Sequence, residues 1–246
     1  MIKSKLTALC TCLLLGSHYT RAQGIYLGFE SGVSMNRMQT NASGRFFTNY
    51  QGLPGIAVAA AVSWEVNKWL ALQTAPTFVQ KNYKLYRTGY FDGVFREFHN
   101  DYWQLPVMAQ FSFGTSVIQG FLNLGAYSAY WSSAATKGRQ PVMWNQGDRD
   151  PASSNKIFSR NGGQTYNEKY EFDNRKDNRR EHGWLAGAGI RWMPGPLSRI
   201  YLECRYYDSQ SDQQKNYMLN RVGRYNQTIC ISLGYQYRLA KLNRLF

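Results

Sequence analysis

Hydroxyl, imidazole and carboxylate side chains occur in this sequence at positions where they could together perform acyl-transfer chemistry. That chemistry needs a nucleophile, a base and an acid that orients the base, all close together. After residue 22 the histidines are His99 and His182. The hydroxyl and carboxyl groups at comparable heights of the predicted strands are Ser128, Ser132, Ser133 and Asp101. No Gly-x-Ser-x-Gly, His-Glu-x-x-His or Cys-x-x-Cys pattern accompanies them. We therefore predict a non-enzymatic protein with no catalytic residues, no cofactor and no metal site.

A second group of charged side chains lies within segments that otherwise alternate between apolar and polar residues. Its members are Glu30, Glu65, Arg191, Glu203 and Arg205. Residues two apart share one side of a strand, so Glu203 and Arg205 face the same way with opposite charges. An unpaired charge in a protein interior is costly. We therefore predict that these residues neutralise one another in a lumenal charge network, with a proton or ion pathway as the alternative.

The strongest structural pattern is in residues 102–114, Tyr-Trp-Gln-Leu-Pro-Val-Met-Ala-Gln-Phe-Ser-Phe-Gly. Every second residue from Trp103 to Phe113 is apolar, and this period of two predicts a strand with one apolar face. That face has about the 9–11 residues that a tilted strand needs to cross a membrane. The pattern predicts an outer-membrane β-barrel with apolar side chains in lipid and polar ones in the lumen.

The same alternation recurs along the chain and predicts an all-β fold, an eight-stranded antiparallel transmembrane β-barrel. The strands are expected near residues 25–35, 56–65, 69–81, 102–114, 117–133, 181–193, 199–208 and 228–237. Polar segments at 36–54, 85–98, 134–180 and 209–223 are expected to be loops, and the other connections are short turns. Long loops outside and short turns in the periplasm are typical of bacterial barrels.

Residues 1–22 have the pattern of an export signal. Lys3 and Lys5 precede a short apolar run, and a polar region ends at Ala22. We expect cleavage there, which leaves residues 23–246 as the barrel domain. Removal of the signal leaves 26 of the 29 basic residues beside all 15 acidic ones. Because nothing in the sequence resembles a nucleic-acid-binding motif, we predict no nucleic-acid partner and expect outer-membrane lipid, anionic lipopolysaccharide or an acidic protein partner instead.

Aromatic residues cluster at the predicted strand ends, where rings sit at the level of the lipid headgroups. The expected girdles contain Trp64, Trp69, Phe111, Phe113 and Trp192 at the periplasmic side, and Trp103, Tyr130, Trp131, Trp184 and Tyr206 at the outer side. A carbohydrate-binding platform is the alternative for this set.

The segment 134–180 is too long for a simple connection, because loops beyond about 12–15 residues are usually functional or disordered. Its candidate interaction residues are Trp144, Phe158, Tyr166, Arg175, Lys176, Arg179 and Arg180. The aromatic residues favour a loop that folds over the barrel mouth or against a partner, and its basic end suits phosphate or carboxylate groups. A solvated flexible loop is the alternative.

Cys204 and Cys230 are the cysteines that remain after residue 22. Export to an oxidising compartment favours a disulfide. The alternation, however, places Cys204 on the outward face of its strand and Cys230 on the inward face of the next, so the side chains diverge. We predict that both are free thiols.

Several segments resemble the PorT-like outer-membrane barrel family of the Bacteroidota. They are Tyr-Trp-Gln-Leu-Pro-Val at 102–107, Phe-Leu-Asn-Leu-Gly-Ala-Tyr at 121–127, Gly-Ala-Gly-Ile at 187–190 and Leu-Glu-Cys-Arg-Tyr-Tyr at 202–207. The aromatic C-terminal residue, Phe246, also resembles the end that barrel-insertion machinery recognises. The resemblance implies an eight-stranded barrel, and it implies a role in type IX secretion for some members.

Four functional hypotheses follow. A non-enzymatic accessory or structural subunit of an outer-membrane complex is the first, and a free-standing barrel that binds an external ligand or lipopolysaccharide through its loops is the second. A lipid A-modifying acyl hydrolase and a small pore are less favoured. Side chains fill the interior of an eight-stranded barrel, which argues against a pore.

Overall fold

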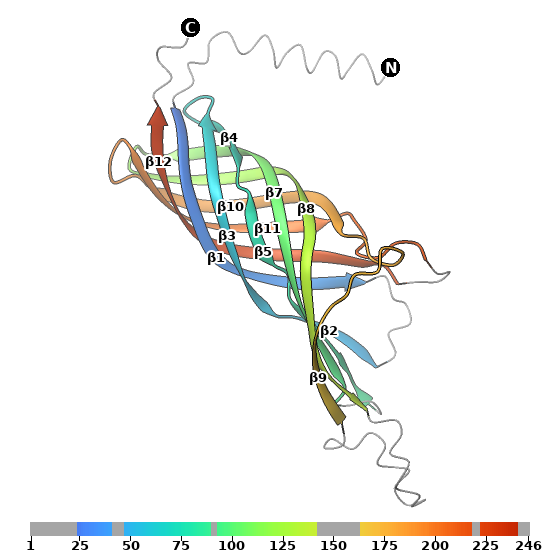
Figure 1. The fold of residues 1–246 in the computed structure, drawn as a ribbon. Coiled ribbons are helices and arrows are strands. Elements are labelled where there is room, and N and C mark those ends of the chain that lie inside the picture. The colour runs from blue at the N-terminus through green and yellow to red at the C-terminus, as the bar shows by residue number, and fades with distance from the viewer. Residues whose placement is uncertain (1–23, 41–46, 90–92, 142–162, 218–221, 241–246) are drawn as a thin grey trace, which may run out of the picture.

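The structure is a computed structural model that describes residues 24–40, 47–89, 93–141, 163–217 and 222–240 (Figure 1). The predicted signal at 1–22 and the terminal Phe246 lie outside these residues. Within them the strands are β1 (Gly24–Thr40), β2 (Thr48–Gly52), β3 (Pro54–Glu65), β4 (Leu70–Thr74), β5 (Thr77–Gln80), β6 (Tyr83–Arg87), β7 (Phe95–Gly114), β8 (Ile118–Pro141), β9 (Gly163–Lys169), β10 (Arg180–Trp192), β11 (Ser198–Ser209) and β12 (Arg224–Ala240).

Antiparallel pairing closes these strands into a ring. β1 pairs with β3 on one side and with β12 on the other, and the order continues through β11, β10, β8 and β7. β4 and β5 follow one another in the remaining position, between β3 and β7. The described residues therefore form a ring of eight strands, which confirms the predicted fold class.

The two faces of the ring differ in chemistry. Along β7, Trp103, Leu105 and Val107 are exposed, whereas Tyr102, Gln104 and Met108, which alternate with them, are buried. Phe29 and Ile190 are each 62% exposed on the outside. So much exposed apolar surface is unfavourable in water but favourable in lipid, so the outer face is the membrane face. Within the described residues no helix has the length and apolar character needed to span a bilayer.

The third strand position is interrupted at Pro76, where a continuous strand over 69–81 was predicted. Proline has no N–H to donate to a neighbouring strand, so the ladder stops after Thr74 and resumes at Thr77. The Thr74 hydroxyl instead donates to the carbonyl oxygen of Pro106 in β7, at 2.8 Å. The inward and outward faces nevertheless keep the same parity across the break, so the predicted outward positions Leu72 and Phe78 are retained.

Short turns join the strands at one end of the barrel, where β1 begins and β12 ends (Figure 1). In the β3–β4 turn, the side-chain oxygen of Asn67 accepts hydrogen bonds from the backbone N–H groups of Trp69 and Leu70, at 2.9 and 2.7 Å. In the β7–β8 turn, Gly114 has φ +120°, a conformation that favours glycine. This end of the barrel is the periplasmic one by the asymmetry of bacterial barrels.

At the other end the strands extend well beyond the length needed to cross a membrane, and three of the four predicted loops there are wrong in part, whereas the described residues of 210–223 contain no strand. β1 continues to Thr40, and β2 occupies part of the segment 36–54. β6 and the first residues of β7 occupy part of 85–98, and the end of β8 and β9 occupy part of 134–180. Cross-strand hydrogen bonds stabilise these strands. Because their residues are largely polar, they lack the alternation of apolar residues by which the strands of the ring were predicted.

These extensions form a sheet that projects past the ring (Figure 1). We call it the outer sheet: β2, β6, residues 95–100 of β7, residues 134–141 of β8, and β9, in that order. A bulge in β8 separates the outer sheet from the ring, because Asp101 pairs with Ser133 and Tyr102 with Trp131, which leaves Ser132 unpaired. The extra residue reverses which side chains of β8 face inward.

The two cysteines of the described residues lie on opposite faces, with Cys204 exposed and Cys230 buried, and both are free. Arg205, not Cys204, is the cross-strand partner of Cys230. We expect a thiol-reactive reagent to label both cysteines in unfolded, unreduced protein, and to label Cys204 alone in the folded barrel. Mass spectrometry of the labelled protein measures this. Labelling that appears only after reduction would show a disulfide and contradict the register of β11 and β12.

Candidate functional site

Arg205 is the centre of the charged interior. Its guanidinium donates to both carboxylate oxygens of Glu30, at 2.6 and 2.9 Å, and to both of Glu203, at 2.5 and 2.7 Å. The Tyr201 hydroxyl donates to Glu30 at 2.8 Å, and the Asn123 amide donates to Glu203 at 2.5 Å. One cation thus holds two carboxylates, and two neutral donors satisfy other lone pairs of the carboxylates. The structure places three of the predicted lumenal charges together here.

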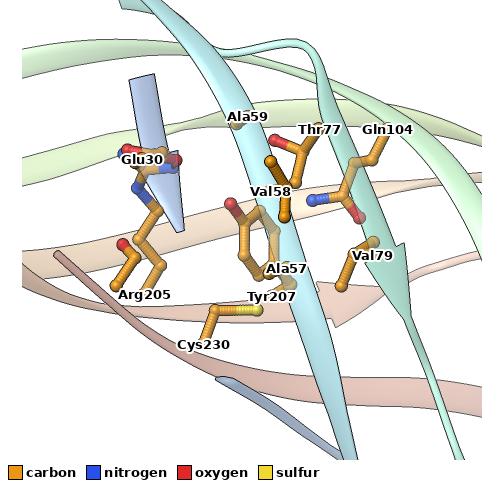
Figure 2. A pocket seen from close by; sticks show the side chains of 11 residues that line it. Glu30, Ala57, Val58, Ala59, Thr77, Val79, Gln104, Arg205, Tyr207 and Cys230 are labelled. Carbon is orange, nitrogen blue, oxygen red and sulfur yellow. Dashed lines mark hydrogen bonds and ion pairs between the residues drawn. The ribbon is translucent and has the colours of Figure 1, made fainter. Parts of the chain in front are cut away.

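A small cavity borders this group, between Arg205, Tyr207 and Cys230 on one side and β3, β5 and Gln104 on the other (Figure 2). The cavity has a volume of about 10 Å³, which is close to the space that one water molecule needs. Elsewhere aromatic rings fold across glycines: a Cβ on Gly234 would collide with the ring of Tyr201. The middle of the lumen is therefore filled by side chains, as expected for an eight-stranded barrel.

A second charged layer lies nearer the periplasmic end. Glu65 forms ion pairs with Arg199 and, at 3.5 Å, with Arg238. Both guanidinium groups lie over the ring of Tyr26, at 3.4 and 4.9 Å from its centroid. Arg191 does not pair with a carboxylate in the described structure; it donates to the side-chain oxygen of Gln110. Glu65 and Arg191 thus lie in this layer, apart from the Arg205 group.

A third layer near the outer end contains a buried pair that the sequence interpretation did not single out. The Lys81 ammonium contacts Glu181 at 2.5 Å, and it lies over the rings of Tyr102 and Tyr127. Tyr127 and Asn226 donate to the two oxygens of Glu181, at 2.8 and 2.7 Å. Lys81, Glu181 and Arg199 are end residues of the predicted strands 69–81, 181–193 and 199–208. All three have the inward parity of their strands, so the alternation was sufficient to identify them.

Aromatic rings close the outer mouth above this pair. Trp131 stacks on Tyr102 with centroids 5.9 Å apart and on Tyr170 at 5.8 Å. The edge of Phe172 meets Trp131 at 4.9 Å, and Arg179 lies over Phe172 at 4.1 Å. Trp131 was predicted to join the outer girdle, and this is wrong, because its side chain points inward and is 4% exposed.

Residues 170–179, which we call the mouth segment, form an ordered connection between β9 and β10. Backbone hydrogen bonds join Tyr170 to Ala134, Asn178 to Gln213 and Lys215 to Lys176. Burial and the nearby carboxylate of Asp177 raise the pKa of Tyr170 to about 12. Tyr170 therefore stays protonated at neutral pH and donates to Asp177, at 3.0 Å.

The candidate interaction residues of the predicted loop are distributed over several elements. Arg175, Lys176 and Arg180 are exposed, whereas Arg179 is partly buried and donates to the carbonyl oxygens of Trp131 and Ser132, at 3.0 Å each. Tyr166 lies in β9, where its hydroxyl accepts from Arg96 at 2.6 Å. Trp144 and Phe158 lie outside the described residues.

The remaining predicted girdle residues lie on the lipid face. Trp69 stacks on Phe111 at 6.1 Å near the periplasmic end, and Trp184 meets Tyr206 edge-on at 5.7 Å near the outer end. The other members of the predicted girdles are also exposed on the outer face: Trp64, Trp103, Phe113, Tyr130 and Trp192.

The residues considered for hydrolysis do not assemble into a nucleophile, base and acid. Ser133 donates to the carboxylate of Asp101 at 2.6 Å, and His99 is 4.0 Å from Glu97. Ser211, in a segment predicted to be a loop, contacts Nδ1 of His182 at 2.7 Å. The same hydroxyl accepts from the backbone N–H of His182 at 2.8 Å, which gives it a structural role in holding β10.

Metal binding has no candidate in the part of the chain that the structure describes. No group of three or more His, Cys, Asp or Glu side chains is placed there to hold an ion.

A closed antiparallel ring with an apolar outer face and a charged, filled interior defines an integral outer-membrane β-barrel protein. Residues 20–212 match the family described as outer membrane protein beta-barrel domain. The chain belongs to this family, and the protein is located in the outer membrane. No curated protein sequence matches the chain closely enough to indicate a relationship.

Solved structures of outer-membrane proteins are similar in shape. Neisserial surface protein A is 11% identical, with 89% of this chain and 99% of that chain covered and a TM-score of 0.44. OprG from Pseudomonas aeruginosa is 11% identical, with coverage of 89% and 98% and a TM-score of 0.45. Ail of Yersinia pestis is 14% identical, with coverage of 87% and 99% and a TM-score of 0.39.

Proposed function

We propose that the protein is a non-enzymatic subunit of an outer-membrane complex, and that it contacts its partner outside the membrane through the outer sheet. The PorT-like resemblance of the sequence favours a type IX secretion apparatus as that complex. The observation that carries the proposal is that the strands continue past the membrane as a paired sheet. A filled lumen argues against a small pore, so the outer sheet is the surface that can meet a partner.

The free edge of β9 is the part of the outer sheet best suited to a protein strand. β9 ends the strand order of the described sheet. The N–H of Tyr170 donates to Ala134 in β8, so by antiparallel alternation Glu168 and Tyr166 also point their backbone groups to β8. The backbone groups of Asn167, which pairs with Lys137, then point away from β8. Such an edge can accept a strand from another chain.

Replacing Asn167 by proline tests this edge. Proline removes the outward N–H of Asn167 but leaves the β8–β9 hydrogen bonds. We expect co-purification of the protein partner from detergent-solubilised membranes to fall about fivefold to tenfold, because one lost hydrogen bond is worth about 1 kcal/mol and the ring adds a steric clash. Quantitative mass spectrometry of the affinity-purified protein measures the recovery.

The matched control is Asn167→Ala, which removes the side chain and keeps the N–H. Heat-modifiable migration on a gel establishes that both variants contain a folded barrel. Equal recovery of a stoichiometric partner with the proline variant and the wild type would exclude the β9 edge as the contact. Recovery of the wild-type protein alone would contradict the proposal of a complex subunit.

The second candidate function is a free-standing barrel that binds lipopolysaccharide or another external ligand. The exposed cations Arg175, Lys176 and Arg180 at the outer mouth favour it, because they can meet phosphate groups of lipopolysaccharide. Glutamine at these three positions should then weaken binding of purified lipopolysaccharide and leave partner recovery unchanged. A loss of partner recovery alone would assign these residues to the complex instead.

A further inference from the structure

The periplasmic end of the barrel contains a hollow that the proposed extracellular function does not use. Its volume is about 580 Å³, within the range of about 300–1,000 Å³ that is typical of small-molecule sites. Tyr26 of β1, Glu65 of β3, Arg199 of β11 and Arg238 of β12 line it. Lys68 and residues of the two neighbouring turns complete the wall.

Positive charge dominates this hollow. Arg199, Arg238 and Lys68 line it, and Glu65 is the one carboxylate among the described lining residues. Arg199 and Arg238 both pair with that carboxylate, so a single anion serves two guanidinium groups. Lys68 is exposed and forms no ion pair with the described residues. The lumen wall has a low dielectric constant, which strengthens the field of the excess cations.

Unpartnered donors accompany this charge. Arg199 is 4% exposed, and its Nη1 has no hydrogen-bond partner in the described structure, although its Nη2 binds Glu65. The Nε of Arg238 is also without a partner among these residues. A buried guanidinium donor without an acceptor is costly. Both side chains line the hollow, so an anionic oxygen bound there would be within their reach.

We propose that this hollow is a binding site for a compact periplasmic polyanion that carries phosphate or carboxylate groups. The guanidinium groups of Arg199 and Arg238 are planar, and each can donate two parallel hydrogen bonds to a phosphate or carboxylate group. Lys68 adds a further positive charge at the exposed side of the hollow. Tyr26 holds the two guanidinium groups in place by contact with its ring face. Glu65 competes for the same donors and sets the affinity.

Isothermal titration of the full-length protein in a non-ionic detergent tests the site, with pyrophosphate and citrate as the phosphate and carboxylate probes. We expect saturable binding of at least one probe to the wild type. Replacing Lys68 and Arg238 together by glutamine should weaken it at least tenfold. Glu65→Gln should strengthen it, because that variant frees Arg199 and Arg238 from their internal anion.

Arg37→Gln is the matched control, because it removes an exposed cation near the outer end of β1, away from the hollow, and should leave binding unchanged. Heat-modifiable migration establishes that each variant is folded, and Lys68→Gln alone keeps the test valid if the double variant does not fold. The absence of saturable binding of both probes to the wild type would overturn the proposal. Equal affinities for the wild type and for a folded Lys68 and Arg238 double variant would also overturn it. Neither result depends on the partner contacts at the outer sheet.

Discussion

Replacing Arg205 by methionine should destabilise the barrel more than any other single exchange in the lumen. The substitution leaves Glu30 and Glu203 buried without their shared cation, and breaking a buried ion pair costs about 3–5 kcal/mol. Tyr201 and Asn123 would still donate to the carboxylates, but neither supplies charge. Urea unfolding of the protein in lipid vesicles, followed by tryptophan fluorescence, measures the change in the free energy of unfolding.

A triple variant provides the control for this prediction. Arg205→Met combined with Glu30→Gln and Glu203→Gln removes the cation and both anions, so it should recover most of the lost stability. Recovery separates the uncompensated charges from a simple loss of packing volume. An Arg205→Met protein as stable as the wild type would show that the carboxylates are not held as the structure places them.

Removing the indole of Trp131 should open the outer mouth. This ring contacts Tyr102, Tyr170 and Phe172 and is buried. Truncation of a buried Trp to Ala costs about 3–5 kcal/mol. If that cost falls on the docking of the mouth segment, the population of molecules with the segment undocked rises about 10²-fold to 5 × 10³-fold. Trypsin cleavage after Arg175 or Lys176, at low protease concentration, measures the opening.

Trp184→Ala is the control for the mouth variant, because Trp184 is exposed on the lipid face, where its ring meets Tyr206. It should leave the rate of cleavage near that of the wild type. If Trp131→Ala and the wild type are cleaved equally fast, another contact holds the segment. Arg179, which donates to two carbonyl oxygens of β8, would then be the next residue to replace.

The sequence was sufficient to predict the ring because lipid imposes a strict alternation. In β11, Leu202 and Cys204 are exposed, while Glu203 and Arg205, which alternate with them, are buried, as a period of two requires. The same rule placed Cys204 and Cys230 on different faces. It holds because side chains that face lipid are predominantly apolar along every strand of the ring.

The outer sheet and the pairing of individual charges could not be predicted in this way. Outside the membrane no solvent imposes alternation, so polar strands such as β2 and β9 have the composition of loops. Trp131 was misplaced because the notion of a girdle considered only height along the barrel and ignored the face. The contact of Glu203 with Arg205 lies within one strand and follows from its period of two. The contact of Glu30 with Arg205 depends instead on the stagger of the strands around the ring, which no single segment encodes.

The seam between β1 and β12 joins the first and last strands of the described chain, with Glu30 opposite Gly234. Ring closure therefore depends on two segments that are far apart in the sequence, and such long-range pairing is slow to form. Until the final strand has been synthesised and exported, β1 has one unpaired edge. A truncated chain that lacks β12 would leave backbone N–H and C=O groups of β1 unpaired in lipid, where each unpaired group is costly. Stable insertion into the membrane therefore selects for chains that include the last strand.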